Sequence, residues 1–292
     1  MSRPSRLLFR ASIPGSVSLA MRAIAGGQTS IGGKTVDATL VQSATDLNNH
    51  LIAASMDVSD FWTTWSDSVL IGADIDAAIA DALGTAAGTF LQAESTTMGL
   101  GRRVKEFWAD VSNLFPKLDQ QLPLRIGPLR SQWDTYGPGM LKHVERQIWT
   151  TEPPADWWPP TVTARMVQPV RGGAGDVCVD QESFWIESLL TNEDPEFPEV
   201  LRAVWLATRV AILTHLRSRT GGAGMTRSWE LASVPLVLTA AEDIGITSGA
   251  VSIGDAMRRW AFGSQAVAAK VDRWWSSREA DESMPAALRR LG

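Results

Sequence analysis

Residues 199–209 read Glu-Val-Leu-Arg-Ala-Val-Trp-Leu-Ala-Thr-Arg and lie within a helical pattern that extends over 196–218. A surface helix carries its apolar residues on one stripe, but this segment carries them on almost every side. We therefore expect it to be the most buried helix of the chain and the one around which the core forms. The apolar residues behind this prediction are Val200, Leu201, Val204, Trp205, Leu206, Val210, Ile212 and Leu213.

The stretch that precedes this helix predicts a small sheet. Residues 161–170 alternate between apolar and polar side chains, 171–175 are rich in glycine, and 176–180 form a second short run. Two such runs joined by a glycine-rich turn are typical of a β-hairpin. Residues 181–191 fit either a helix or a third short strand. The sequence thus predicts an antiparallel hairpin that packs on the long helix.

Helices are predicted for most of the remaining chain, because apolar residues recur there every three or four positions. Gly137, Pro138 and Gly139 are expected to kink or split the helix that they interrupt, and the last few residues are expected to fray. The predicted fold class is mainly α (α+β), a helical bundle plus a small antiparallel β-hairpin packed on a long buried helix. Residues 57–60 are expected to be a break and a new N-cap. The helical segments are 37–56, 61–70, 73–94, 101–115, 124–150, 228–244, 252–262 and 264–278.

Three regions follow from these patterns. Residues 1–36 are rich in glycine, serine and arginine and are predicted to be a basic flexible arm. Residues 37–151 form a helical region, and 152–292 form a region of hairpin plus helices. The prolines and tryptophans at 152–160 exclude a helix there and mark the best boundary. We expect the two larger regions to pack as one compact unit, with two separate domains as the alternative.

The charge is unevenly distributed along the chain. The net charge is −5, yet residues 1–36 carry five basic side chains and no acidic one, so the rest of the chain carries −10. Nucleic-acid binding needs a basic face that displaces counterions from phosphate, and an acidic body argues against it. The sequence therefore predicts no nucleic-acid partner.

The number of cysteines and the length of the apolar runs indicate the cellular compartment. Cys178 is the single cysteine, which excludes an internal disulfide framework and fits a reducing compartment. The apolar runs are shorter than a secretory signal (about 7–15 residues) or a transmembrane helix (about 18 or more) requires. We expect a soluble, cytoplasmic protein without a transmembrane segment.

Motifs for metal, nucleotide or nucleophilic chemistry are missing from the sequence. Residues 26–35 look like a phosphate-binding loop, but Gln28 stands where the first glycine of such a loop is needed. His50, His143 and His215 are far apart, whereas zinc sites usually draw two ligands from one short spacing. The G-x-S-x-G elbow of serine hydrolases is also missing. The sequence predicts no metal site and no cofactor.

The order of elements in the C-terminal half resembles the layout of small zincin-type metallopeptidases. It comprises an interrupted helix, a hairpin with a glycine-rich turn, and a long buried helix. In those families the long helix carries the zinc-binding H-E-x-x-H pattern. Here that helix contains no histidine before His215. The resemblance therefore implies a degenerate scaffold that does not bind zinc in the usual way.

The tryptophan content points to a partner. The chain has thirteen tryptophans, and Trp157 and Trp158 lie beside rigid prolines. Exposed aromatic residues in such a segment can dock a partner with little loss of side-chain entropy. Arg3, Arg6 and Arg10 offer a second contact through charge. The sequence predicts a non-catalytic protein-interaction or assembly component that binds another protein or a second copy of itself.

Two alternatives stay open at this point. Trp157 and Trp158 would lose this role if they fold back onto their own domain while the arm is solvated or disordered. The chain would instead be a hydrolase-like enzyme of unfamiliar type if acids and histidines from several helices meet in one place. A cleft that gathers His143, His215 or Glu182 would favour the enzyme.

Overall fold

The computed structural model describes residues 4–88, 94–189, 194, 197–219, 223–247, 251–279 and 282–291. Most of these residues are helical and a few form small sheets, which confirms the predicted mainly α class. The chain forms two compact units. Unit 1 consists of Met1–Arg10, Arg125–Met166 and Gly173–Gly292, and unit 2 of Ala11–Leu124 and Val167–Gly172. The boundary predicted at 152–160 therefore lies inside unit 1.

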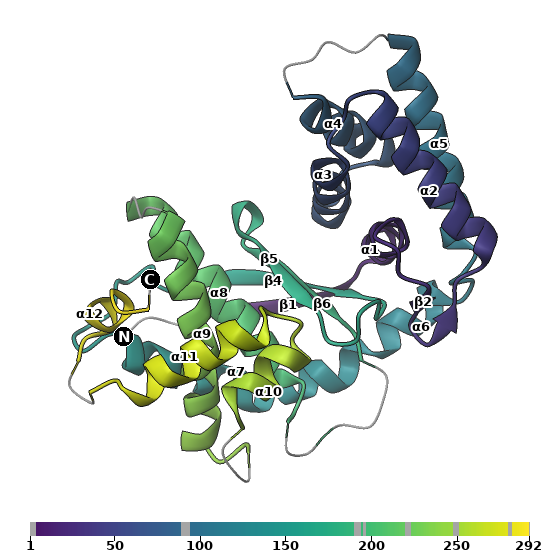
Figure 1. Cartoon of the computed structure of the whole chain (residues 1–292). Helices are drawn as coiled ribbons and strands as arrows, with labels where there is room; N and C mark the ends of the chain where they lie inside the picture. Colours follow the sequence, from purple (N-terminus) through teal and green to yellow (C-terminus); the bar gives the residue numbers. More distant parts are fainter. Residues whose placement is uncertain are drawn as a thin grey trace. The chain divides into compact units, whose positions relative to one another are not determined.

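Unit 2 is a group of helices built around α1 (Ile13–Ala25), which packs against α2, α3, α5 and α6 (Figure 1). Aspartates at 37, 57 and 74 cap α2, α3 and α4, each by accepting a backbone N–H with its carboxylate. Such caps satisfy amides that lack a partner within the helix. The further helices of unit 2 are α2 (Ala38–Ala53), α3 (Val58–Ile71), α4 (Ile75–Ala87), α5 (Glu94–Ser112) and α6 (Leu118–Leu124).

The prediction that residues 1–36 form a flexible arm is wrong for most of that segment. Residues Arg6–Ala11 form strand β1, and Ile13–Ala25 form the buried helix α1. Pro14 lies in the first turn of α1, where a proline is tolerated because its missing N–H has no partner in any case. Ser12 Oγ caps the helix by accepting the Gly15 N–H at 3.2 Å.

The glycine-rich segment that follows α1 is a tight hairpin in unit 2. Strands β2 (Ser30–Ile31) and β3 (Lys34–Thr35) pair in antiparallel register, with Ile31 opposite Lys34. Gly32 and Gly33 join them with φ angles of 56° and 79°. Two successive positive φ angles fit the two-residue turns of β-hairpins and favour glycine. These glycines therefore form a structural turn.

Unit 1 contains a four-stranded sheet with the order β1-β4-β6-β5. The prediction that 161–170 pairs with 176–180 is wrong, because β6 lies between them. Strands β5 and β6 instead form the antiparallel hairpin, with Asp176 opposite Trp185 and Cys178 opposite Ser183. The strands are β4 (Thr161–Val167), β5 (Gly175–Cys178) and β6 (Ser183–Glu187).

The turn between β5 and β6 carries only a weak sequence signal for this pairing. It is a short 3₁₀ helix, η1 (Val179–Gln181), followed by Glu182 at a φ of 44°. Turns usually contain glycine, proline, asparagine, aspartate or serine, and of these this turn contains only Asp180. The sequence of residues 181–191 fits either a helix or a strand, and the structure shows a strand at Ser183–Glu187.

Helix α8 (Val200–Arg219) is the core helix of unit 1, as predicted. Every residue from 200 to 213 is buried. Figure 1 shows α8 packed between the sheet and α9, and the hairpin β5–β6 contacts it directly. The further helices of unit 1 are α7 (Ile126–Ile148), α9 (Ala223–Asp243), α10 (Ile253–Arg259), α11 (Gln265–Ser276) and α12 (Met284–Leu288).

Two further expectations concern helices in unit 1. Helix α7 runs through Pro138 as one helix, so of the two predicted effects, a kink or a split, the split is wrong. The residues expected to fray at the C-terminus form α12, whose Ala287 carbonyl accepts a hydrogen bond from Trp274 Nε1 at 2.8 Å in the interior of unit 1. Within the described ranges, no helix is long and apolar enough to cross a membrane.

Candidate functional site

Strand β1 lies at one edge of the four-stranded sheet, with β4 on its inner side. Ser5 Oγ donates a hydrogen bond to the Pro159 carbonyl at 2.6 Å, and the Arg6 N–H donates to the Pro160 carbonyl at 3.1 Å. These two bonds hold the start of β1 against the segment that leads into β4. The strand is thus a fixed edge of unit 1.

The side chains of β1 alternate as those of a half-buried strand do. Leu7 and Phe9 are buried, whereas Arg6 and Arg10 are exposed. A leucine and a phenylalanine on one face supply the apolar area that attaches the strand to unit 1. The two arginines are left on the other face.

The first half of α7 faces β1. Arg130, Trp133, Asp134 and Pro138 have the spacing of one helix face, and Trp133 is buried. The guanidinium of Arg130 lies over the Phe9 ring, 5.9 Å from its centre. This contact ties the helix to the strand and directs a third arginine toward the same place.

A groove of about 640 Å³ separates β1 from this part of α7. It is bordered by every residue from Pro4 to Arg10. Consecutive strand residues point to opposite faces, so a groove that borders all seven of them follows the edge of the strand. The residues that α7 contributes are Arg130, Trp133, Asp134 and Pro138.

The groove is electropositive. Three arginines and one aspartate border it, which leaves two positive charges in excess. Among the described residues, no carboxylate forms an ion pair with Arg6, Arg10 or Arg130. Burial lowers the pKa of Arg165 on the neighbouring strand β4, the nearby Cys178 raises it, and the positive charge of Arg10 lowers it further. The sheet therefore presents basic groups close together on this side.

The arginines predicted as contact residues divide into two sets. Arg6 and Arg10 both border the groove, whereas Arg3 lies outside the described residues. Sequence reasoning missed the α7 side of the groove. The spacing of Arg130, Trp133 and Asp134 was visible as a helix face, but nothing in the sequence showed that it lies beside β1.

Trp157 and Trp158 are not exposed anchors. Their exposed fractions are 2% and 3%. Trp158 Nε1 donates a hydrogen bond to Glu145 Oε2 at 2.7 Å, and Trp157 packs edge-on against Trp149 and His215, with ring centres 5.4 and 5.2 Å away. The proline-rich crossing folds back onto unit 1, so its two tryptophans fill the core and are not available to dock a partner.

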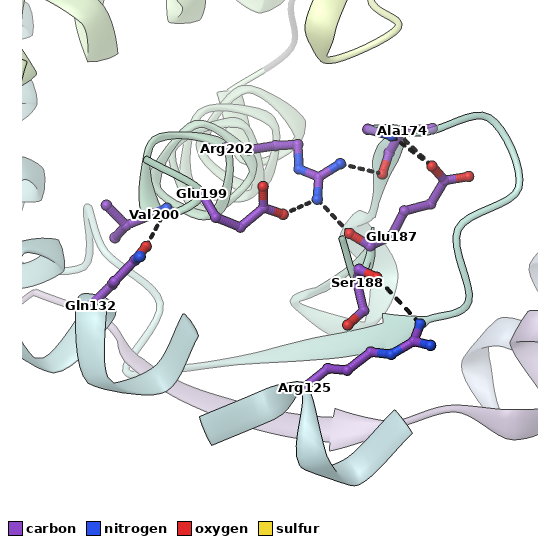
Figure 2. A network of polar contacts seen from close by, with 9 residues as sticks. Arg125, Gln132, Ala174, Glu187, Ser188, Glu199, Val200 and Arg202 are labelled. Atoms are coloured by element: carbon purple, nitrogen blue, oxygen red, sulfur yellow. Dashed lines mark hydrogen bonds and ion pairs between the residues drawn. The ribbon is translucent and has the colours of Figure 1, made fainter. Parts of the chain in front are cut away.

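A buried polar network joins the β5–β6 hairpin to α8 (Figure 2). The Glu187 carboxylate accepts the N–H groups of Gly173 and Ala174 at 2.7 and 3.1 Å. Arg202 donates to the Ala174 carbonyl at 3.2 Å, to the Glu187 carbonyl, and to the carboxylate of Glu199. Buried charges are tolerated when they are paired in this way. The network fixes the chain on both sides of the hairpin to the core helix.

The same network contains a carboxyl group with a perturbed pKa. Burial raises the pKa of Glu199 above its ordinary value of 4.5, while the charge of Arg202 and its hydrogen bond lower it and Glu187 raises it further. Gln132 Oε1 accepts the Val200 N–H at 3.1 Å, and Arg125 donates to the Ser188 carbonyl at 3.4 Å (Figure 2). These neighbours attach the start of α7 to the same region, which indicates a structural role for the cluster.

A cleft that gathers His143, His215 or Glu182 would have favoured an enzyme, but these residues lie in different surroundings. His143 on α7 lies 3.7 Å from a carboxylate oxygen of Asp243 on α9. His215 packs against the indole of Trp149, 5.7 Å between ring centres, and Glu182 ends the 3₁₀ turn after β5. Within the part of the chain that the structure describes, no group of three or more His, Cys, Asp or Glu side chains is placed to hold a metal ion.

Comparisons with known proteins give no relative. No family model matches the chain, and neither a curated protein nor a solved structure matches it.

Proposed function

We propose that this chain is a non-catalytic protein-interaction or assembly component that docks its partner in the groove between β1 and α7. The observation that carries the proposal is an edge strand whose residues from Arg6 to Arg10 border a groove with three arginines on it. In the part of the chain that the structure describes, no carboxylate forms an ion pair with these arginines, so their charge is available for a partner. Rigid placement on a strand and a helix reduces the entropy lost on docking.

The composition of the groove supports a protein partner. Its lining combines apolar groups, such as Leu8 and Trp133, with a few charged ones. Protein interfaces have the same anatomy, with an apolar centre, a polar rim, and arginine and tryptophan enriched over the rest of the surface. The acidic charge of residues 37–292 disfavours a nucleic acid. We place the protein in the cytoplasm, because a chain with one cysteine forms no internal disulfide and therefore needs no oxidising environment.

Position-specific photo-crosslinking in the native cell tests this proposal. A photoreactive phenylalanine analogue replaces Leu8, which is half-buried in the groove, and in a second sample it replaces Asp272, which is exposed on α11. We expect an adduct at position 8 that is missing at position 272. Adding Arg6→Glu and Arg10→Glu to the Leu8 sample is expected to reduce that adduct about tenfold, because opposite charges then become like charges.

The mass of the adduct shows which kind of partner is bound. An adduct with twice the mass of the chain would identify a second copy and support an assembly role. Equal adducts at the two positions, or none at position 8, would overturn the proposal.

A further inference from the structure

Building on the proposed function, we infer that the groove accepts an extended, acidic segment of a partner protein, which adds to the outer edge of β1 as one more strand of the sheet. The inference specifies how the groove is occupied and by what chemistry. It depends on the edge of β1, on the alternation of its side chains and on the charge around it.

The backbone of β1 has hydrogen-bonding groups directed away from the sheet. The Arg6 N–H points toward the β4 side, since it donates to the Pro160 carbonyl. Backbone groups of successive strand residues alternate between the two edges. The N–H and C=O groups of Leu7 and Phe9 therefore point outward, on the side where the described chain places no further strand. Such an edge is a template for a strand from another chain.

The side chains around this edge define the pattern that the added strand needs. Arg6 and Arg10 stand on one face of β1, and Leu7 and Phe9 on the other, with Trp133 of α7 close to the groove. Side chains that lie opposite each other on paired strands interact directly, and opposite charges are favourable there. A segment that alternates acidic and apolar residues meets both requirements.

The charge of the groove selects against a basic segment. Its excess of two positive charges comes from Arg6, Arg10 and Arg130 set against Asp134. A carboxylate can accept two parallel hydrogen bonds from one guanidinium, which makes arginine a strong partner for glutamate and aspartate. A lysine in the same place would meet like charge and lose this pairing.

Fluorescence anisotropy with the full chain and synthetic probes tests the inference. The probe is a fluorescein-labelled peptide of about six alternating valine and glutamate residues, the usual length of a strand. The first comparison replaces glutamate by lysine. The second uses two N-methylated forms of the Val/Glu peptide, one methylated at the valines and the other at the glutamates. In a paired strand only one of these two sets donates hydrogen bonds to β1, and methylation removes those donors.

We expect the Val/Glu peptide to bind at least about tenfold more tightly than the Val/Lys peptide, because lysine cannot pair with the arginines as glutamate does. A tenfold change corresponds to about 1.4 kcal/mol. One N-methylated form is expected to lose at least about tenfold and the other less than about twofold, since only one set of amides faces β1. Arg6→Glu/Arg10→Glu is expected to weaken the Val/Glu peptide by about tenfold. The matched control, Arg273→Glu/Arg289→Glu, changes the net charge equally at exposed positions of unit 1 outside the groove and should change affinity less than about twofold.

Several results would overturn the inference. These are equal affinity for the Val/Lys peptide, equal effects of the two N-methylated forms, no binding of the Val/Glu peptide, and equal losses in the groove and control variants. If one of them occurs while the crosslink at position 8 persists, the groove docks a partner in another way and the proposed function stands. If the crosslink also fails, the proposed function fails with it.

Discussion

Trp205 is the residue on which the core of unit 1 depends most clearly. Its exposed fraction is 0%. Its indole stacks on Trp260 with ring centres 4.8 Å apart, meets Phe262 edge-on, and donates a hydrogen bond from Nε1 to Ser233 Oγ at 2.9 Å. The guanidinium of Arg209 lies 5.0 Å from the centre of the same ring system. Elements α8, α9 and the end of α10 therefore meet at this one side chain.

Replacing Trp205 by alanine is expected to lower the free energy of unfolding by about 3–5 kcal/mol, because the cavity left by a buried aromatic side chain cannot collapse completely. Urea denaturation measures the loss. The control is Tyr136→Ala on α7, whose side chain is exposed and whose loss should cost about 0.5 kcal/mol or less. A similar cost for both variants would contradict the assignment of α8 as the core helix.

Glu199 makes the stability depend on pH in a defined direction. Burial raises the pKa of its carboxyl in the folded state above the ordinary value of 4.5. A group with a raised pKa binds more protons when folded, so the free energy of unfolding falls as pH rises from about 4.5 through the folded pKa. In Glu199→Gln this contribution is removed, and we expect the decline over that window to be shallower. Denaturant titrations at a series of pH values measure it, and parallel wild-type and variant curves would refute the prediction.

At the scale of elements, the loop that enters β5 is held against α10. Gly173 has a φ of 122°, and a Cβ there would collide with the Arg259 carbonyl oxygen at the end of α10. Both the backbone angle and the close approach require glycine. The loop and the polar network of Glu187 and Arg202 therefore depend on each other, since the Glu187 carboxylate binds the N–H of the same Gly173.

Gly173→Ala is expected to cost about 1–3 kcal/mol, the range for a residue forced into a conformation that disfavours it. Its matched control is Gly139→Ala in α7, where an added Cβ meets no atom within 4 Å. That change should stabilise the chain by about 0.5–1 kcal/mol, because alanine loses less backbone entropy in a helix. Urea midpoints that move in the same direction for both variants would contradict this account.

Helix α1 begins at an N-cap formed by residues typical of that position. Ser12 Oγ accepts the Gly15 N–H, and Pro14 occupies the first turn. Ser12→Ala removes the acceptor and is expected to lower the free energy of unfolding of unit 2 by about 1 kcal/mol. Thr85→Ala, at an exposed position inside α4, is the control and should be neutral or slightly stabilising. Hydrogen exchange of the α1 amides reports the change, and unaltered protection in Ser12→Ala would exclude the cap as a source of stability.

At the scale of the whole molecule, the distribution of charge favours a protein partner over a nucleic acid. The basic residues of the groove form one short strip, while residues 37–292 carry a net charge of −10. A duplex contacts a protein through many phosphates, and an acidic body repels it. We expect no binding of a labelled DNA duplex at about 10 μM protein and 0.15 M salt, conditions under which specific binding would be visible. Binding stronger than that of the Val/Glu peptide would show that the strip serves a nucleic acid.

Features that depend on neighbouring residues could be predicted without the structure. Asp37 and Asp57 were predicted as helix starts and both cap helices. The dense apolar pattern around Trp205 predicted the buried helix, because a helix that is apolar on nearly all sides must be surrounded by protein. Periodicity and capping act within a few positions along the chain, so they are visible without any knowledge of the fold.

The contacts between distant segments could not be predicted from the sequence and are visible only in the folded chain. Arg6 and Arg10 looked like part of an arm, yet Leu7 and Phe9 attach them to the sheet beside a segment more than 100 residues away. Strand β6 inserts between the two strands expected to pair, through a 3₁₀ turn that contains neither glycine nor proline. Trp157 is buried because Trp149 and His215 surround it. These outcomes depend on which apolar surfaces cover one another after folding, and that choice is made by contacts between segments far apart in the sequence.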